Sequence, residues 1–171
     1  CWYSSKYWTE KVEVDVLQLQ YDHQDKIAPR LGCFELLEQL KQQGYRCWLL
    51  TNVDLAGLQL KLEYVDSSPY FEVMISSEEI GYSKEFVQFW QILQQRHPFD
   101  PQYAFMIDDT APVLEGAKKF GIQNLITIIQ PSSQKPPRAV QELHYPALDH
   151  LTALLPLIAQ SHMKDLDVKT A

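Results

Sequence analysis

Two adjacent aspartates, Asp108 and Asp109, directly follow the short apolar run at 103–107. Such a run is typical of a buried strand, and a helix is predicted next because Pro112 is tolerated in a first turn. Two acids at the carboxyl end of a strand lie where open α/β sheets bind ligands. Neighbouring carboxylates disfavour each other unless a cation neutralises them, and oxygen ligands suit Mg²⁺. The pair therefore predicts a magnesium site, with an acidic helix cap as the ordinary structural alternative.

Polar residues mark two other places where the chain changes element. The apolar run at 47–50 ends in Thr51 and Asn52, and Lys84 follows a turn at 81–83 where a helix is predicted to begin. A lysine is a compact point charge suited to phosphate, and a helix start offers backbone N–H groups to an anion. Singly, Thr51 could cap a turn and Lys84 could be a solvated surface residue. In the order Thr, Lys, Asp-Asp, these residues match a phosphoryl-transfer site.

Four short segments resemble the haloacid dehalogenase (HAD) superfamily of phosphohydrolases and, within it, the bacterial GMP/IMP 5′-nucleotidases: LLTN at 49–52, KLE at 61–63, GYSKE at 81–85 and IDDT at 107–110. The resemblance extends from about residue 2 to about residue 158. It implies that Thr51 and the backbone of Asn52 bind phosphate oxygens. It also implies that Lys84 neutralises phosphate and nucleophile, and that Asp108 and Asp109 hold Mg²⁺. Thr51, Lys84, Asp108 and Asp109 are thus the expected catalytic residues.

The first motif of this superfamily, an apolar strand followed by Asp-x-Asp-Gly-Thr, does not occur in the 171 residues. The resemblance implies that its first Asp is the nucleophile and its second the general acid/base. Two acidic stretches, at 13–15 and 22–25, are the available substitutes, but neither is followed by Gly-Thr. Covalent catalysis needs a carboxylate positioned beside the phosphate. We therefore expect this chain to be a fragment of a longer enzyme and inactive as given.

The resemblance implies a Mg²⁺-dependent phosphomonoester hydrolase that works through an aspartyl-phosphate, with a purine nucleoside 5′-monophosphate as substrate. The main alternative is a non-catalytic relative that binds phosphate or a nucleotide. A phosphoacceptor signalling domain is disfavoured because its acidic pair comes first in the chain, whereas here Thr51 and Lys84 precede Asp108. Four aromatic residues could stack a purine or could simply pack the cap: Trp2, Tyr3, Tyr7 and Trp8.

Composition agrees with a single globular domain, since 46% of the residues are hydrophobic and 22% are charged. The formal net charge of −7 argues against broad binding to nucleic acid or anionic membranes. No apolar run is long enough to cross a bilayer. The three cysteines lack C-x-x-C spacing, which argues against a disulfide framework or a zinc site. We predict a cytoplasmic protein that binds a small phosphate ester, with no nucleic acid and no membrane as partner.

Alternating strands and helices predict a Rossmann-like, three-layer α/β/α fold with a parallel sheet. Strands are expected at 46–51, 71–75, 103–107 and 124–129; helices at 33–40, 56–65, 84–95, 112–120 and 149–159. Residues 1–26 are expected to be the C-terminal part of a helical cap, 27–160 the HAD-like core and 161–171 a frayed polar tail. In the superfamily's strand order the missing first strand is central, between the strands ending at Thr51 and Asp108. Without it, each unsatisfied buried backbone group costs about 1–3 kcal/mol.

Overall fold

The strands form two parallel groups. The computed structural model describes the backbone of residues 4–169 and the side chains of residues 4–161. β1 (Trp48–Thr51) pairs with β2 (Val73–Ser76), and β3 (Phe105–Ile107) pairs with β4 (Asn124–Ile128), which also pairs with β5 (Ala147–Leu148). Among the described residues no ladder joins β1 to β3. This separation lies at the position of the central strand that the sequence predicts to be missing, and the parallel α/β class is confirmed.

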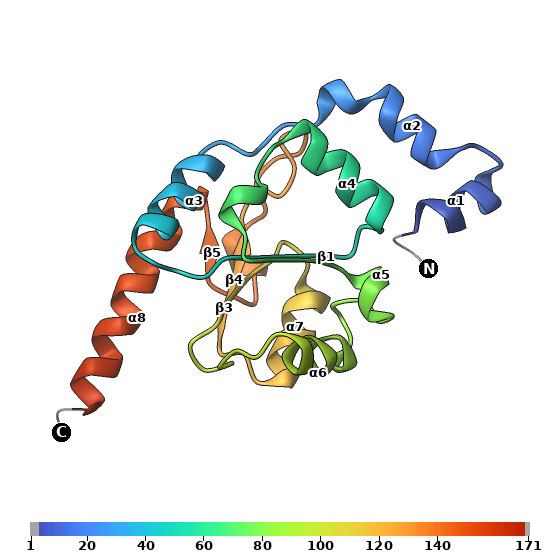
Figure 1. Ribbon diagram of the computed structural model, residues 1–171. Helices are drawn as coiled ribbons and strands as arrows, with labels where there is room; N and C mark the ends of the chain where they lie inside the picture. Colours follow the sequence, from blue (N-terminus) through green and yellow to red (C-terminus); the bar gives the residue numbers. More distant parts are fainter. Residues whose placement is uncertain (1–3, 170–171) are drawn as a thin grey trace.

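Helices lie on both sides of these strands. In chain order they are α1 (Ser5–Val12), α2 (Val16–Asp22), α3 (Cys33–Gln42), α4 (Leu55–Tyr64), α5 (Ser77–Ile80), α6 (Val87–Arg96), α7 (Ala111–Phe120) and α8 (Leu154–Lys169). Figure 1 shows α6 and α7 on one side of the strands and α3 and α4 on the other. This is the layered arrangement expected when helices follow parallel strands and must bury one face each.

Two hydrophobic clusters hold the layers together. The first buries Phe89 and Trp90 of α6 and Leu114 of α7 against β2, β3 and β4. The second buries Leu36 of α3 and Ile158 of α8 against β4 and β5. Fully burying one such side chain stabilises the fold by about 1.5–3 kcal/mol. β4 contributes Leu125 to the first cluster and Ile126 to the second, so this strand is packed on both faces.

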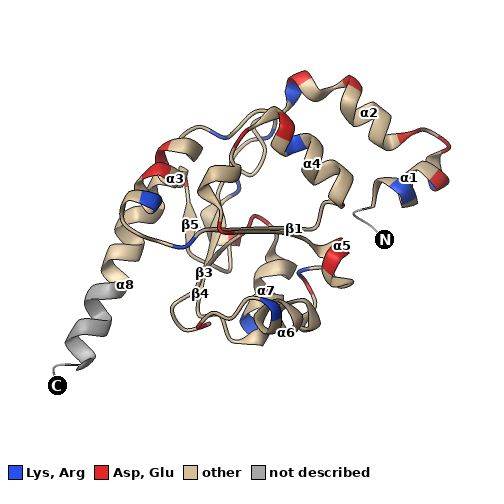
Figure 2. Cartoon of the chain, viewed as in Figure 1, with Lys and Arg blue, Asp and Glu red and all other residues tan. Residues whose placement is uncertain are grey.

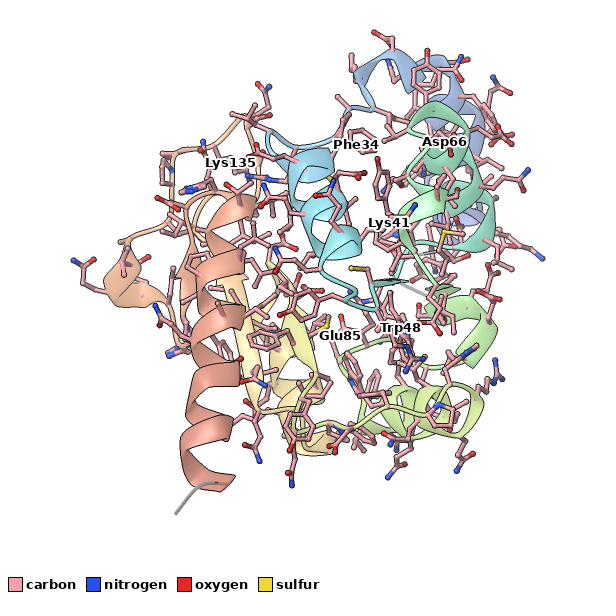
Figure 3. All side chains as sticks on the ribbon, turned by 60° about the vertical axis from the view of Figure 1, so that its left-hand side comes forward. Phe34, Lys41, Trp48, Asp66, Glu85 and Lys135 are labelled. Carbon is pink, nitrogen blue, oxygen red and sulfur yellow. The ribbon has the colours of Figure 1, made fainter. Side chains whose placement is uncertain are left out.

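The outer side of α3 packs on the segment that leads to β2. Phe34 and Lys41, both labelled in Figure 3, contact the Tyr70 ring, with a ring separation of 5.8 Å for Phe34 and the Lys41 ammonium 5.4 Å from the ring centre. The Lys41 ammonium also donates to the Pro69 carbonyl at 3.3 Å. These contacts connect the two strand groups through a helix, in a region where no backbone ladder does so.

The N-terminal helices contact α4. The Asp54 carboxylate caps α4 by accepting from the Gly57 amide at 3.0 Å, and it also accepts from the amide and hydroxyl of Ser5 at 2.6 and 2.5 Å. Burial raises the pKa of Asp54, but the hydrogen bonds from Ser5 and Gly57 outweigh it and leave the pKa below its ordinary value. The stabilisation is therefore complete above the unfolded pKa and is lost as pH falls through the folded pKa.

Several boundaries differ from those the sequence predicts. α6 begins at Val87 rather than Lys84, because Lys84 and the two residues after it form the preceding turn. The four-residue α5 and the two-residue β5 are too short to leave a periodic signal. α8 continues to Lys169, past the end near residue 159 that its apolar pattern indicates. The division into cap, core and tail stays a prediction.

The two acidic stretches weighed as nucleophiles have structural roles. Asp15 caps α2 by accepting from the Gln18 amide at 2.9 Å, and Asp22 accepts from the Gln18 side chain at 2.9 Å. Trp2 and Tyr3 of the aromatic group lie outside the described residues. The rings of Tyr7 and Trp8 meet edge to face, 5.4 Å apart. In the described part of the chain, no helix combines the length and apolarity needed to cross a membrane.

Candidate active site

The centre of the site is an ion pair between Lys84 and Asp108. The Lys84 ammonium lies 2.6 Å from Oδ2 of Asp108, and only 8% and 10% of the two side chains are exposed. The same ammonium donates to the Leu50 carbonyl of β1 at 3.0 Å. Lys84 therefore spans the space between β1 and the end of β3. A buried cation of this kind is tolerated only because an anion and a hydrogen-bond acceptor face it.

The backbone of Lys84 is fixed by two further hydrogen bonds. Its amide donates to Oδ1 of Asn52 at 2.9 Å, and its carbonyl accepts from the indole N–H of Trp90 at 2.8 Å. The Asn52 side-chain amide also donates to Glu85 at 3.1 Å. The family resemblance implied a role only for the backbone of Asn52, whereas its buried side chain links the end of β1 to the Lys84 turn.

Gly116 lets the Lys84 turn lie directly on α7. A Cβ at this position would lie 2.6 Å from the carbonyl oxygens of both Lys84 and Glu85, closer than real Cβ contacts. Both contacts are with backbone, which cannot rotate away as a flexible side chain would. The close approach of α7 to the turn therefore depends on glycine.

We expect Gly116→Ala to cost up to about 3 kcal/mol in overpacking, the upper end of the usual range, because both close contacts are with backbone oxygens. The helix preference of alanine offsets about 1 kcal/mol of this, so the expected net destabilisation is about 2 kcal/mol. Urea unfolding measures the change, and Lys118→Ala at an exposed position of the same helix is the control. A Gly116→Ala protein as stable as the wild type would show that the turn does not rest on α7 as described.

Thr51 ends β1 beside Asn52. Its Oγ1 accepts from the Val53 amide at 3.1 Å, which leaves the hydroxyl proton available for another acceptor. The hydroxyl is thus oriented by the turn that follows the strand. Thr51, Asn52 and Lys84 are brought together through the contacts of β1 with the Lys84 turn.

The two aspartates occupy different environments. Each Asp108 oxygen has a protein partner, Lys84 for Oδ2 and the Thr110 amide, at 2.8 Å, for Oδ1. Asp109 is exposed, and among the described side chains its carboxylate has no hydrogen-bond or ion-pair partner. Its backbone carbonyl accepts from the Arg138 guanidinium at 3.0 Å. The structure therefore places Asp108 inside the site and Asp109 at its rim.

The carboxylate oxygens of Asp108 and Asp109 are compatible with Mg²⁺. Mg²⁺ is commonly held by one or two carboxylates, keeps several waters and completes its shell with substrate phosphates. Asp109 offers unpaired oxygens, and each Asp108 oxygen keeps a second lone pair. No cluster of three or more His, Cys, Asp or Glu side chains suited to a metal is found among the described residues. The described part of the chain therefore offers a metal at this site at most two carboxylates, those of Asp108 and Asp109.

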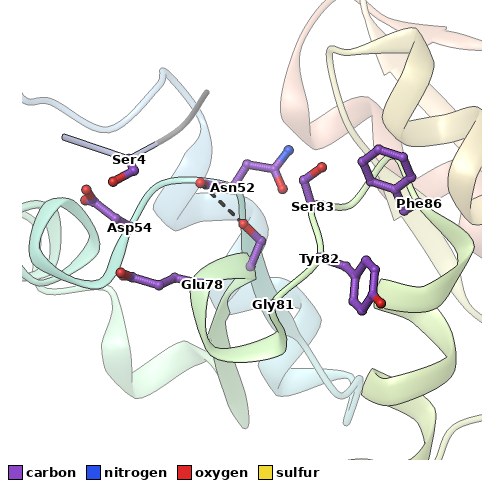
Figure 4. Close-up of a pocket in the computed structure, with 9 residues that line it drawn as sticks. Ser4, Asn52, Asp54, Glu78, Gly81, Tyr82, Ser83 and Phe86 are labelled. Atoms are coloured by element: carbon purple, nitrogen blue, oxygen red, sulfur yellow. Dashed lines mark hydrogen bonds between the residues drawn. The ribbon is translucent and has the colours of Figure 1, made fainter. Parts of the chain in front are cut away.

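A pocket of about 280 Å³ borders the Lys84 turn. Its wall includes Asn52, Ser83 and two exposed aromatic residues, Tyr82 and Phe86 (Figure 4). Two of the lining residues are hydrogen-bonded to each other, since the Ser77 hydroxyl donates to the Asn52 carbonyl at 3.4 Å. On the opposite side the pocket is lined by Glu78 of α5 (Figure 4). Figure 2 shows the acidic part of α5 in red. Sequence reasoning missed this pocket because its walls come from three separate segments.

Comparisons with known proteins identify the family of the chain. The family model of haloacid dehalogenase-like hydrolases matches residues 3–127, which is most of the chain. The chain therefore belongs to the haloacid dehalogenase-like hydrolases. The resemblance predicted from the four short segments is confirmed.

Individual relatives cover most of the chain. The GMP/IMP nucleotidase YrfG of Escherichia coli (strain K12) is 26% identical over 155 residues, which are 91% of this chain and 69% of that protein. A HAD phosphatase from Thermococcus onnurineus has a TM-score of 0.75 at 20% identity, covering 92% of this chain and 71% of its own. The HAD-hydrolase YfnB from Bacillus subtilis, solved bound to magnesium, has a TM-score of 0.67 at 19% identity, covering 84% and 60%. The chain thus spans 60–71% of these three proteins.

Proposed function

We propose that this chain forms part of a Mg²⁺-dependent phosphomonoester hydrolase whose substrate is a purine nucleoside 5′-monophosphate. The observation that carries the proposal is the buried Lys84–Asp108 pair beside Thr51 and Asn52. A fixed cation next to a free hydroxyl proton is suited to a phosphoryl group, because phosphoryl transfer relies on positioning and charge stabilisation. The nucleotide specificity is supported by the similarity to the E. coli nucleotidase.

Each residue has a defined task in this proposal. Lys84, oriented by Asp108, neutralises phosphoryl oxygens, while the Thr51 hydroxyl and the Asn52 backbone bind them. Asp108 and Asp109 hold Mg²⁺, which supplies further charge neutralisation when bound. Charge on the equatorial oxygens of the transferring group is the quantity that such donors stabilise.

The nucleophile is proposed to come from a further strand. A carboxylate there would attack phosphorus, the alcohol would leave with a proton, and water would then hydrolyse the aspartyl-phosphate. The proposal puts that strand between β1 and β3, which is supported by the lack of a ladder joining them among the described residues. Among the described residues, the carboxylate that contacts the Lys84 ammonium is that of Asp108, which the proposal assigns to Mg²⁺ and not to the nucleophile.

The alternative is a non-catalytic relative that binds phosphate or a nucleotide without turning it over. It is supported by the lack of Asp-x-Asp-Gly-Thr in the 171 residues. The coding sequence upstream of Cys1 discriminates between the two. An in-frame Asp-x-Asp-Gly-Thr after an apolar run supports the hydrolase, whereas an uninterrupted reading frame without it supports the binding protein.

Substrate class is tested with a protein that includes the upstream segment. We expect phosphate release in Mg²⁺ to be faster from GMP and IMP than from ribose 5-phosphate, because the base adds binding energy that the sugar phosphate lacks. The same comparison of substrates is repeated with Lys118→Ala, an exposed position away from the site, which should keep the wild-type order of rates. Equal or faster release from sugar phosphates would keep the family and remove the nucleotide assignment.

A further inference from the structure

The Arg138 side chain bonds two segments at the edge of the site, the residue after Asp108 and the strand β4. One terminal nitrogen donates to the Asp109 carbonyl at 3.0 Å, and the other donates to the Thr127 hydroxyl at 3.2 Å and to the Ile128 carbonyl. Thr127 is buried in β4, next to β3. The guanidinium therefore ties the residue after Asp108 to a rigid strand.

The Arg138 amide donates to the Ile129 carbonyl at 2.9 Å, but the Arg138 side chain has no further partner among the described residues. Among the described residues it takes part in no ion pair, and its buried Nε–H has no acceptor. A half-buried cation that gives up an ion pair and leaves a donor unsatisfied incurs a cost. The contact that remains to offset this cost is the planar fork over Asp109, Thr127 and Ile128, which lysine cannot reproduce.

The loop that carries Arg138 is itself anchored at its other end. Arg30 donates to the carbonyls of Gln130 and Pro131 at 2.6 and 2.9 Å. The Gln130 side chain in turn donates to the carbonyl of Lys135, on the outer loop labelled in Figure 3, at 2.8 Å. Hydrogen bonds therefore hold the loop at both ends, and they keep Arg138 in contact with Asp109.

We infer that Arg138 is a positioning residue for Asp109: its fork fixes the peptide that carries this carboxylate, and so aims the carboxylate at the metal position. The inference rests on the proposed function in its assignment of Asp109 to Mg²⁺. It goes beyond that function because neither the motifs nor the resemblance involves Arg138. Arg138 touches neither the proposed nucleophile nor the phosphate, so it acts through Asp109.

The charge and the hydrogen bonds of Arg138 have opposite effects on a cation at Asp109. The guanidinium repels the cation, so removing its charge alone would tighten Mg²⁺ binding. Removing the hydrogen bonds frees the segment that carries Asp109, and loss of such outer contacts commonly weakens metal binding about 10–100-fold. Arg138→Lys keeps the charge without the fork, and Arg138→Met removes both. The two variants therefore separate positioning from electrostatics.

The test uses the 171-residue chain and amide hydrogen exchange by NMR. We expect exchange at the hydrogen-bonded amides of Asp108 and Thr110, on either side of Asp109, to quicken about fivefold or more in Arg138→Lys and in Arg138→Met, because the segment opens locally. Arg46→Met, at the amino end of β1 and paired with Glu72, is the control and should leave both amides unchanged. Unchanged exchange at both amides in the two Arg138 variants overturns the inference.

Mg²⁺ titration of the same amide shifts adds a second readout. Weaker Mg²⁺ binding in both Arg138 variants supports the inference. Wild-type affinity in Arg138→Lys together with tighter binding in Arg138→Met overturns it, because charge alone would then explain the result. If the wild type gives no Mg²⁺ response while exchange quickens in the variants, the positioning of the segment is supported, and the metal assignment of the proposed function fails.

Discussion

Lys84→Met is expected to destabilise the protein by about 3–5 kcal/mol, because it leaves the Asp108 carboxylate buried without its cation. The lost contacts are the 2.6 Å ion pair and the hydrogen bond to the Leu50 carbonyl. The second variant, Lys84→Met with Asp108→Asn, removes the unpaired charge as well. We expect this double variant to be more stable than Lys84→Met alone, although it has one more substitution.

Urea unfolding of the wild type, both single variants and the double variant gives a double-mutant cycle. A coupling energy well above the ~0–1 kcal/mol typical of exposed pairs is the predicted result. Lys118→Met, on the exposed face of α7, is the matched lysine control and should change stability by no more than about 0.5 kcal/mol. Additive single-variant effects would mean that Lys84 and Asp108 do not depend on each other.

The strand-end residues of the site could be predicted because their signals are local. Thr51 and Asp108 each interrupt an apolar run, and parallel strands bring their carboxyl ends to one edge of a sheet. Lys84 was expected to begin a helix, but it lies in the turn before α6. Its placement depends on acceptors in β1 and in the segment after β3, which no window of sequence around Lys84 contains.

The contacts that hold the site could not be predicted from local pattern. Trp90 reads as one apolar position of an amphipathic helix, and nothing in its neighbourhood indicates that its N–H bonds the Lys84 carbonyl. The interior glycine of α7, Gly116, did carry a signal, because an isolated glycine in a helical pattern often has a packing reason. Asp108 and Asp109 are chemically identical neighbours, so their different environments emerge only when Lys84 and Arg138 approach from distant parts of the chain.

The second large effect concerns turnover. We expect the 171-residue chain to release no phosphate from GMP above background, because loss of a covalent nucleophile can cost several orders of magnitude in rate. A version that includes an upstream Asp-x-Asp-Gly-Thr strand should be active in Mg²⁺. That activity should fall by orders of magnitude in Asp108→Asn or Lys84→Ala, and Lys118→Ala should preserve it.

Phosphate release from GMP by the purified 171-residue chain, measured beside its Asp108→Asn variant and beside the longer version, tests the central claim most directly. The predicted result is turnover by the longer version alone, abolished there by Asp108→Asn. Steady release by the 171-residue chain that disappears on Asp108→Asn would contradict it, because the nucleophile would then lie within these residues.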